Sequence, residues 1–155
     1  MNSILFVCHG NICRSPMAEA LFRDLLLRNN LSTKVKVDSA GIGNWHFGKP
    51  PHQGTCEVLS KRKIPYENIT ARQITKEDFN KFDLIIVMDE RNQKSIKELA
   101  GNKAINVHYL SEFITESDCI DIPDPYHTGE FEKAYQLIHA GCQGLLKKIL
   151  SKEIL

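Results

Sequence analysis

The sequence has no long apolar run and no excess of charge of either sign. Its 155 residues include 20 basic and 19 acidic side chains, which leaves a net charge of +1. So balanced a charge gives no reason to expect nucleic acid or a membrane surface as a partner, and no stretch is long enough to cross a bilayer. The first residues, Met1-Asn2-Ser3, lack the basic segment of an export signal, so we expect a cytoplasmic protein.

Cysteine occurs only as an odd set of five, and no pattern among them suits a structural role. Cytoplasmic proteins rarely form structural disulfides. Cys8 and Cys13 are not at zinc-finger spacing, and no second Cys or His pair completes a zinc site. We therefore expect no structural disulfide, no metal and no cofactor. The five cysteines are Cys8, Cys13, Cys56, Cys119 and Cys142.

Strand-like and helix-like segments alternate along the chain. Strands are predicted over residues 4–7, 34–38, 82–88 and 104–110. Helices are predicted over residues 16–28, 53–61, 75–79, 91–100 and 131–149, with a long loop over 112–127. This order normally gives parallel strands with right-handed crossovers, and the length suits one domain. We predict a single α/β domain over residues 1–155: a four-stranded parallel sheet with 82–88 as the central strand, and helices on both faces in a Rossmann-like arrangement.

The first predicted strand leads directly into a short loop and then a helix. The loop is Cys8-His9-Gly10-Asn11-Ile12-Cys13-Arg14-Ser15, and Pro16 follows it. Ser15 is a favoured N-cap and Pro16 a favoured first helical residue. A loop that ends at a helix N-terminus presents backbone N–H groups and the positive end of the helix dipole. The sequence therefore predicts a phosphate-binding loop after the first strand.

Cys8 and Arg14 give this loop a chemistry. A thiolate is a nucleophile and a thiol is not, and loop amides, a helix end and a guanidinium all favour the thiolate. The planar fork of Arg14 can hold two phosphoryl oxygens at once. A free cysteine is often only a small core residue, but the junction of strand and helix is where the catalytic motif requires it. We predict that Cys8 attacks phosphorus while Arg14 and the amides hold the equatorial oxygens.

Phosphoryl transfer to a thiolate also needs an acid for the leaving oxygen and a base for the attacking water. One carboxylic acid can do both in turn. Asp124 is the candidate, because Pro123 and Pro125 restrict the backbone on either side of it. An Asp-Pro pair can also simply start a turn.

The segment from Cys8 to Pro16 resembles the phosphate-binding loop of the low-molecular-weight protein-tyrosine phosphatases. Further matches follow in the family's order: Asp38-Ser39-Ala40-Gly41, Asn44-Trp45, Ala71-Arg72-Gln73, Met88-Asp89-Glu90 and Asp124-Pro125-Tyr126. The resemblance implies hydrolysis of phosphotyrosine in proteins through a phosphocysteine, without a metal. It also implies that phosphate or another oxyanion binds in the loop, and that the protein is a monomer or a weak dimer.

The resemblance also assigns roles to the residues around the nucleophile. Trp45 and Tyr126 would form two walls of a slot for the substrate's ring, and Asn11 would hold the loop in shape through its amide and a positive φ. Ser15 would offer its hydroxyl to the sulfur. The residues expected to bind substrate are His9, Gly10, Asn11, Ile12, Cys13, Ser15, Trp45 and Tyr126.

The sequence departs from the family at two places. His127 stands where the family often has a second tyrosine. The family also supports the loop with a histidine shortly before the Ala-Arg-Gln segment, and here Ile69 or Thr70 takes that place. A supporting network that joins Asn11 and Ser39 must therefore be closed in another way.

Three other functions are weighed against this one. Thiol-coupled arsenate reductases share the loop but use further cysteines, and none lies between Cys56 and Cys119. Protein-arginine phosphatases share the loop but typically have Thr at the position of Ile12. Ile12, with Trp45 and Tyr126, favours a substrate of the size of phosphotyrosine, and protein-arginine phosphatase is kept as the main alternative. An anion receptor without turnover would not need both a nucleophile and an acid.

Cys13 lies in the same loop as Cys8. We predict a reversible disulfide between them under peroxide, which protects Cys8 from irreversible oxidation.

Overall fold

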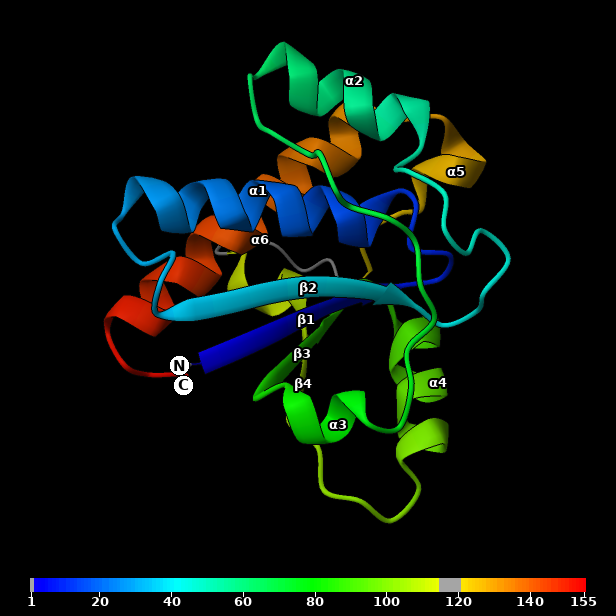
Figure 1. Cartoon of the computed structure of the whole chain (residues 1–155), viewed down its shortest axis with the longest axis vertical. Coiled ribbons are helices and arrows are strands. Elements are labelled where there is room, and N and C mark those ends of the chain that lie inside the picture. The colour runs from blue at the N-terminus through cyan, green and yellow to red at the C-terminus, as the bar shows by residue number, and fades with distance from the viewer. Residues whose placement is uncertain (1, 115–120) are drawn as a thin grey trace.

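A four-stranded parallel sheet runs through the middle of the molecule (Figure 1). The computed structural model describes residues 2–114 and 121–155, so Cys119 lies outside the described residues. The strands are β1 (Asn2–Cys8), β2 (Val35–Gly41), β3 (Leu84–Val87) and β4 (Val107–Tyr109). They lie in the order β2-β1-β3-β4, and every neighbouring pair is parallel. The predicted α/β fold is confirmed, with β1 and β3 together at the centre of the sheet.

Helices cover both faces of the sheet, as predicted. One face carries α1 (Arg14–Arg28), α6 (Phe131–Leu150) and, packed beyond them, α2 (Gln53–Lys61), and the other carries α3 (Asp78–Lys81) and α4 (Glu90–Ala100) (Figure 1). Ile4 and Phe6 of β1 join the core under α1 and α6, whereas Leu5 and Val7 join the core toward α4. Because β1 is buried from both sides, its sequence is apolar without alternation.

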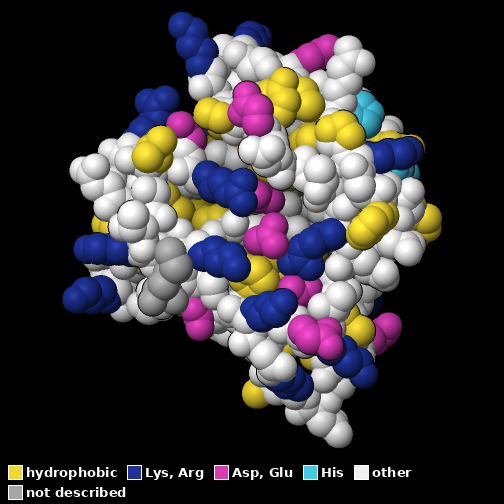
Figure 2. All heavy atoms as spheres, in the orientation of Figure 1, with side chains coloured by type: hydrophobic (Ala, Val, Ile, Leu, Met, Phe, Trp, Pro, Cys, Tyr) yellow, Lys and Arg dark blue, Asp and Glu magenta, His cyan; other side chains and the backbone are white. Residues whose placement is uncertain are grey.

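The surface agrees with the balanced composition. On the face seen in Figure 2, Lys and Arg side chains are interspersed with Asp and Glu. Within the described residues, no helix has the length and apolar character needed to span a membrane. The start of β1 and the C-terminus lie at the amino ends of the strands, opposite the loop that follows β1 (Figure 1).

β2 is longer than predicted, and its extra residues reach the loop. The strand was expected to end at Asp38 but pairs with β1 as far as Cys8 opposite Gly41. A Cβ atom on Gly41 would lie 3.0 Å from the carbonyl carbon of Gly10 and 3.1 Å from the backbone nitrogen of Asn11. Only glycine allows this close approach without moving backbone. β3 and β4 are instead shorter than their predicted spans.

The start of α1 corrects one prediction. The helix begins at Arg14 with Cys13 as its N-cap, so Ser15 is not the cap and Pro16 is not the first helical residue. The Ser15 hydroxyl does not cap the helix because it faces Cys8 instead, at 3.0 Å from the sulfur. Pro16 still lies among the first four residues, whose N–H groups have no partner within a helix.

The short helices also differ from the predicted segments. The helix expected over 75–79 is displaced to α3, because the carboxylate of Asp78 accepts a hydrogen bond from the N–H of Thr75 and holds a turn before it. The segment expected as a loop contains α5 (Pro125–Thr128), and a 3₁₀ turn, η1 (Leu110–Phe113), precedes it. Asp124 is the N-cap of α5, so the Asp-Pro pair does start a turn of helix.

Candidate active site

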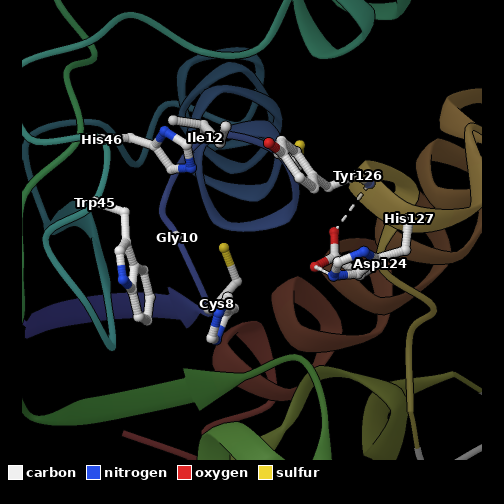
Figure 3. Close-up of a pocket in the computed structure, with 10 residues that line it drawn as sticks. Cys8, Gly10, Ile12, Trp45, His46, Asp124, Tyr126 and His127 are labelled. Carbon is white, nitrogen blue, oxygen red and sulfur yellow. Dashed lines mark hydrogen bonds and ion pairs between the residues drawn. The ribbon is translucent and has the colours of Figure 1, made fainter.

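A pocket of about 340 Å³ opens beside the carboxyl end of β1, at the edge where open parallel sheets place their sites (Figure 3). Three segments that are far apart in the sequence meet there: the loop after β1, the loop after β2 and the start of α5. The lining residues are Cys8, His9, Gly10, Ile12, Cys13, Trp45, His46, Asp124, Tyr126 and His127. Of the remaining residues expected at the site, Asn11, Arg14 and Ser15 are buried behind this lining.

Asn11 holds the loop in its curled shape. Its φ is 57°, the positive value that the sequence predicted, and its side chain is buried. The Oδ1 atom accepts from the backbone N–H of Arg72 at 3.0 Å. The Nδ2 group donates to Ser15 Oγ at 2.7 Å and to Ser39 Oγ at 2.9 Å. One amide thus ties the loop to α1, to β2 and to the segment after α2.

The Cys8 sulfur points into the pocket (Figure 3). Its Sγ lies 3.0 Å from Ser15 Oγ. Because Ser15 Oγ already accepts a hydrogen bond from Asn11, its own proton is available for another acceptor. The sulfur is nearer to Ser15 Oγ than a second possible acceptor, the carbonyl oxygen of Ala40 at 3.4 Å. The arrangement suits a negatively charged sulfur.

Arg14 is buried and held in place by fixed acceptors. Its Nη1 donates to Asp89 Oδ2 at 2.7 Å and to the carbonyl oxygen of Ile122 at 2.8 Å, and Nη2 lies 3.5 Å from Asp124 Oδ2. Burial lowers the pKa of the Arg14 guanidinium, but the negative groups around it, led by Cys8 and Asp89, raise it overall above its ordinary value. The Nε atom is buried and has no hydrogen-bond partner among the described residues. Arg14 is therefore a fixed cation with one donor to spare.

Asp124 has two contacts that fix its orientation. Oδ1 accepts from the backbone N–H of Tyr126 at 3.1 Å, as an N-cap does. Oδ2 faces Arg14, with His127 Nε2 at 4.0 Å. The carboxyl group lines the pocket on the side of α5 (Figure 3). Asp124 thus caps α5 with one oxygen and still lines the pocket.

Aromatic rings flank the pocket on two opposite sides. Trp45 and Tyr126 face one another across it, and they remain 60% and 54% exposed (Figure 3). His9 stacks on Trp45 with ring centroids 4.4 Å apart. His46 lies 6.0 Å from the Tyr126 ring and also lines the pocket. Sequence reasoning missed His46, although it directly follows Trp45 in the same glycine-rich loop.

Cys13 has a different environment from Cys8, although both line the pocket. Burial above all, with Cys8 and Asp124 adding to it, raises the pKa of the Cys13 thiol far above its usual range. Cys13 is therefore a neutral thiol in the lining of the same pocket as Cys8. Cys142 is buried in the core and Cys56 is half-buried on α2. Among the described residues, no group of three His, Cys, Asp or Glu is placed to hold a metal ion.

The network that supports the loop is closed by an acid rather than by a histidine. Ile69 is buried in the hydrophobic core and takes no part in it. Ser39, which accepts from Asn11, donates instead to Glu19 Oε1 at 2.6 Å. Glu19 was expected only as a helical residue, because nothing in the sequence shows which face of α1 meets β2 at this point.

Comparison with known proteins identifies close relatives over the whole chain. The family model described as "Low molecular weight phosphotyrosine protein phosphatase" matches residues 3–154. The low molecular weight protein-tyrosine-phosphatase YfkJ of Bacillus subtilis is 51% identical over 150 residues, which cover 96% of each chain.

Solved structures agree. The crystal structure of YfkJ from Bacillus subtilis superposes with a TM-score of 0.96 at 48% identity, covering 99% of this chain and 98% of that one. DARP, the arginine phosphatase of Drosophila, gives a TM-score of 0.88 at 33% identity, covering 96% of this chain and 98% of that one. The chain therefore belongs to the low molecular weight phosphotyrosine protein phosphatase family, and it is a hydrolase of that family.

Proposed function

We propose that the protein hydrolyses phosphotyrosine in proteins by way of a phosphocysteine on Cys8. The observation that carries the proposal is the convergence of three groups on one pocket: a sulfur 3.0 Å from the Ser15 hydroxyl, a buried guanidinium whose Nε has no partner among the described residues, and a carboxyl group opposite them. A nucleophile, an anion holder and an acid are the parts that phosphoryl transfer requires.

In the first step the Cys8 thiolate attacks phosphorus. The sulfur–phosphorus bond forms as the bond from phosphorus to the phenolic oxygen breaks, and Asp124 gives its proton to that oxygen. Negative charge spreads over the three equatorial oxygens in a loose transition state. The loop amides and Arg14 would stabilise it, and the unpartnered Arg14 Nε supports this role, because a phosphoryl oxygen is the acceptor that it lacks.

In the second step a water molecule attacks the phosphocysteine. Asp124, now ionised, takes a proton from the water, the oxygen–phosphorus bond forms, and the sulfur leaves as a thiolate. The hydrogen bond from Ser15 stabilises this leaving sulfur, just as it stabilises the attacking one.

The walls of the pocket support an aromatic phosphate as the substrate. Trp45 and Tyr126 can contact both faces of a phenyl ring. Ile12 presents an apolar side chain to the same pocket, and that side chain gives a phosphoarginine guanidinium no hydrogen-bond partner. The likeness to DARP keeps protein-arginine phosphatase as the second candidate.

We also propose that Cys13 protects Cys8 from oxidation. Peroxide converts the Cys8 thiolate to a sulfenic acid and is itself reduced to water. Cys13 then loses its proton and attacks that sulfur as a thiolate. The sulfur–sulfur bond forms as the sulfur–oxygen bond breaks, and the departing hydroxide takes up the proton and leaves as a second water. Support comes from the placement of both sulfurs in one pocket and from the electrostatic effect of Cys8 on Cys13.

Asp124→Asn should lower kcat for an aryl phosphate by about 10²–10⁴-fold, because the amide can neither donate the acid proton nor accept one from water. Asp83→Asn is the matched control. Asp83 accepts from Ser3 at the amino end of the sheet, away from the pocket, so its rate should stay close to that of the wild type. Steady-state kinetics gives both values. An unchanged rate for Asp124→Asn would end its assignment as acid and base.

A panel of phosphopeptides should separate the candidate substrates. We expect fast release of phosphate from phosphotyrosine, and little from phosphoserine, whose short side chain cannot reach Cys8 between the two rings. Phosphoarginine should be a poor substrate, and arsenate reduction should be absent. Cys8→Ser is the control for contaminating activity and should release no phosphate. Phosphoarginine turnover faster than phosphotyrosine turnover would favour the second candidate.

Peroxide treatment should give a product with one Cys8–Cys13 disulfide, and a reductant should restore full activity. Peptide mass spectrometry detects the bond. Cys13→Ser should be inactivated by peroxide at an initial rate similar to that of the wild type. Its loss of activity should be irreversible, because the sulfenic acid has no neighbouring thiol. Sulfinic acid on Cys8 of the wild type, without any disulfide, would contradict this role of Cys13.

A further inference from the structure

A chain of buried hydrogen bonds connects the Cys8 sulfur to a carboxylate on the far side of the loop. It runs from Cys8 to Ser15 at 3.0 Å, to Asn11 at 2.7 Å and to Ser39 at 2.9 Å. It ends at Glu19, whose Oε1 lies 2.6 Å from Ser39 Oγ and which is only 3% exposed. The chain thus links the proposed nucleophile to an acid that takes no direct part in the reaction.

The donors and acceptors of this chain can be assigned by counting protons. The backbone N–H of Arg72 can only donate, so the atom of Asn11 that faces it must be the oxygen. The two protons of the Asn11 amide nitrogen then go to Ser15 and Ser39. Each serine keeps one proton, which it can give to its outer neighbour.

The two ends of the hydrogen-bond chain, Glu19 and Cys8, differ in how strictly they must accept a proton. An ionised Glu19 can only accept, so the Ser39 proton must go to it, and Ser39 must in turn accept from Asn11. If the Asn11 amide were turned over, its oxygen would compete with Cys8 for the Ser15 proton. An ionised Glu19 therefore adds to the Arg72 N–H in favouring the one amide orientation in which Ser15 donates to the sulfur.

We propose that Glu19, supported by Arg23, is a positioning residue. It fixes which atom donates in each hydrogen bond from Ser39 to Cys8, so that the Ser15 proton points to the Cys8 thiolate. The proposal rests on the nucleophilic role of Cys8 proposed above. Glu19 acts through Ser39 and Asn11, and it does not touch the substrate. It takes the place in the network that the missing histidine has in the family.

Arg23 is the partner that keeps Glu19 charged. Its Nη2 forms an ion pair with Glu19 Oε2 one turn along α1 and also donates to the carbonyl oxygen of Val37 in β2. Burial raises the pKa of Glu19 above its ordinary value, while the Ser39 hydrogen bond and the Arg23 charge lower it. Two more distant charges face the same carboxyl group: Asp38 raises the pKa and Arg72 lowers it. Without Arg23, Glu19 would more readily take up a proton.

The direction in which Glu19→Gln changes the alkylation rate of Cys8 separates this positioning role from a simple charge effect. Glu19→Gln removes a negative charge near the sulfur, which by Coulomb's law alone would favour the thiolate and speed the alkylation of Cys8. The same substitution supplies an amide that can donate to Ser39. The Ser39 proton is then free, and Asn11 keeps only the constraint from the Arg72 N–H. We therefore expect the opposite result: alkylation of Cys8 by iodoacetamide that is about three- to tenfold slower at a fixed pH below neutrality.

Arg23→Gln provides a second variant whose side chain is partly in solvent, so that the fold is less disturbed. It should slow the alkylation of Cys8 in the same direction, and Arg23→Lys should restore most of the rate. The matched control is Arg28→Gln, which removes an arginine paired with Asp24 at the same spacing on the same helix. Arg28→Gln should leave the rate unchanged.

The alkylation rate is read for Cys8 separately from Cys13 by tandem mass spectrometry, with thermal unfolding as the check on the fold. If Cys8 of the wild type reacts no faster than an ordinary thiol, the proposed function fails. If the wild type reacts fast but Glu19→Gln reacts equally fast or faster, only the role of Glu19 is overturned. The role of Glu19 is also overturned if Arg23→Gln is folded and its Cys8 is alkylated as fast as that of Arg28→Gln.

Discussion

The rest of the site depends on the 3.0 Å contact between the Ser15 hydroxyl and the Cys8 sulfur. Burial disfavours the charged form of a thiol, and Cys8 stands at the buried end of β1. The structure places the Ser15 hydroxyl against this sulfur, at the point where the loop after β1 leads into α1. The sheet contributes by bringing Gly41 of β2 against Gly10, which leaves room for the curl only because residue 41 has no side chain.

Two acids share the buried guanidinium of Arg14, and their distances suit different tasks. Asp89 is in close contact at 2.7 Å and caps α4 with its other oxygen, so it is held on both sides. Asp124 is farther away at 3.5 Å and sits on a short helix at the pocket rim. The shorter contact of Asp89 positions the cation, whereas Asp124 lines the pocket in which a substrate would bind. We infer that the same cation organises the phosphate site through one acid and the proton-transfer group through the other.

The local order of the chain near the nucleophile was readable from the sequence, because strand, loop and helix signals are short-range. The strand before Cys8, the positive φ of Asn11 and the boundaries of α2 follow from neighbouring residues alone. Trp45 and Tyr126 could be assigned to one slot only through the resemblance to a family, since nothing local links two residues so far apart. The cap of α1 was misjudged because a serine that normally caps a helix is used here by the sulfur. His46 and Glu19 were not found because their roles depend on which faces of the loop and of α1 turn inward, and that is decided by tertiary packing.

The central claim is that the loop after β1 makes the Cys8 sulfur the reactive nucleophile of the site. The most direct measurement is the rate of Cys8 alkylation by iodoacetamide at a fixed pH below neutrality, with and without orthovanadate. We expect Cys8 to react much faster than a free thiol such as glutathione, and orthovanadate, which binds where phosphate does, to protect it strongly. A rate no faster than that of the free thiol, together with no protection, would contradict the account.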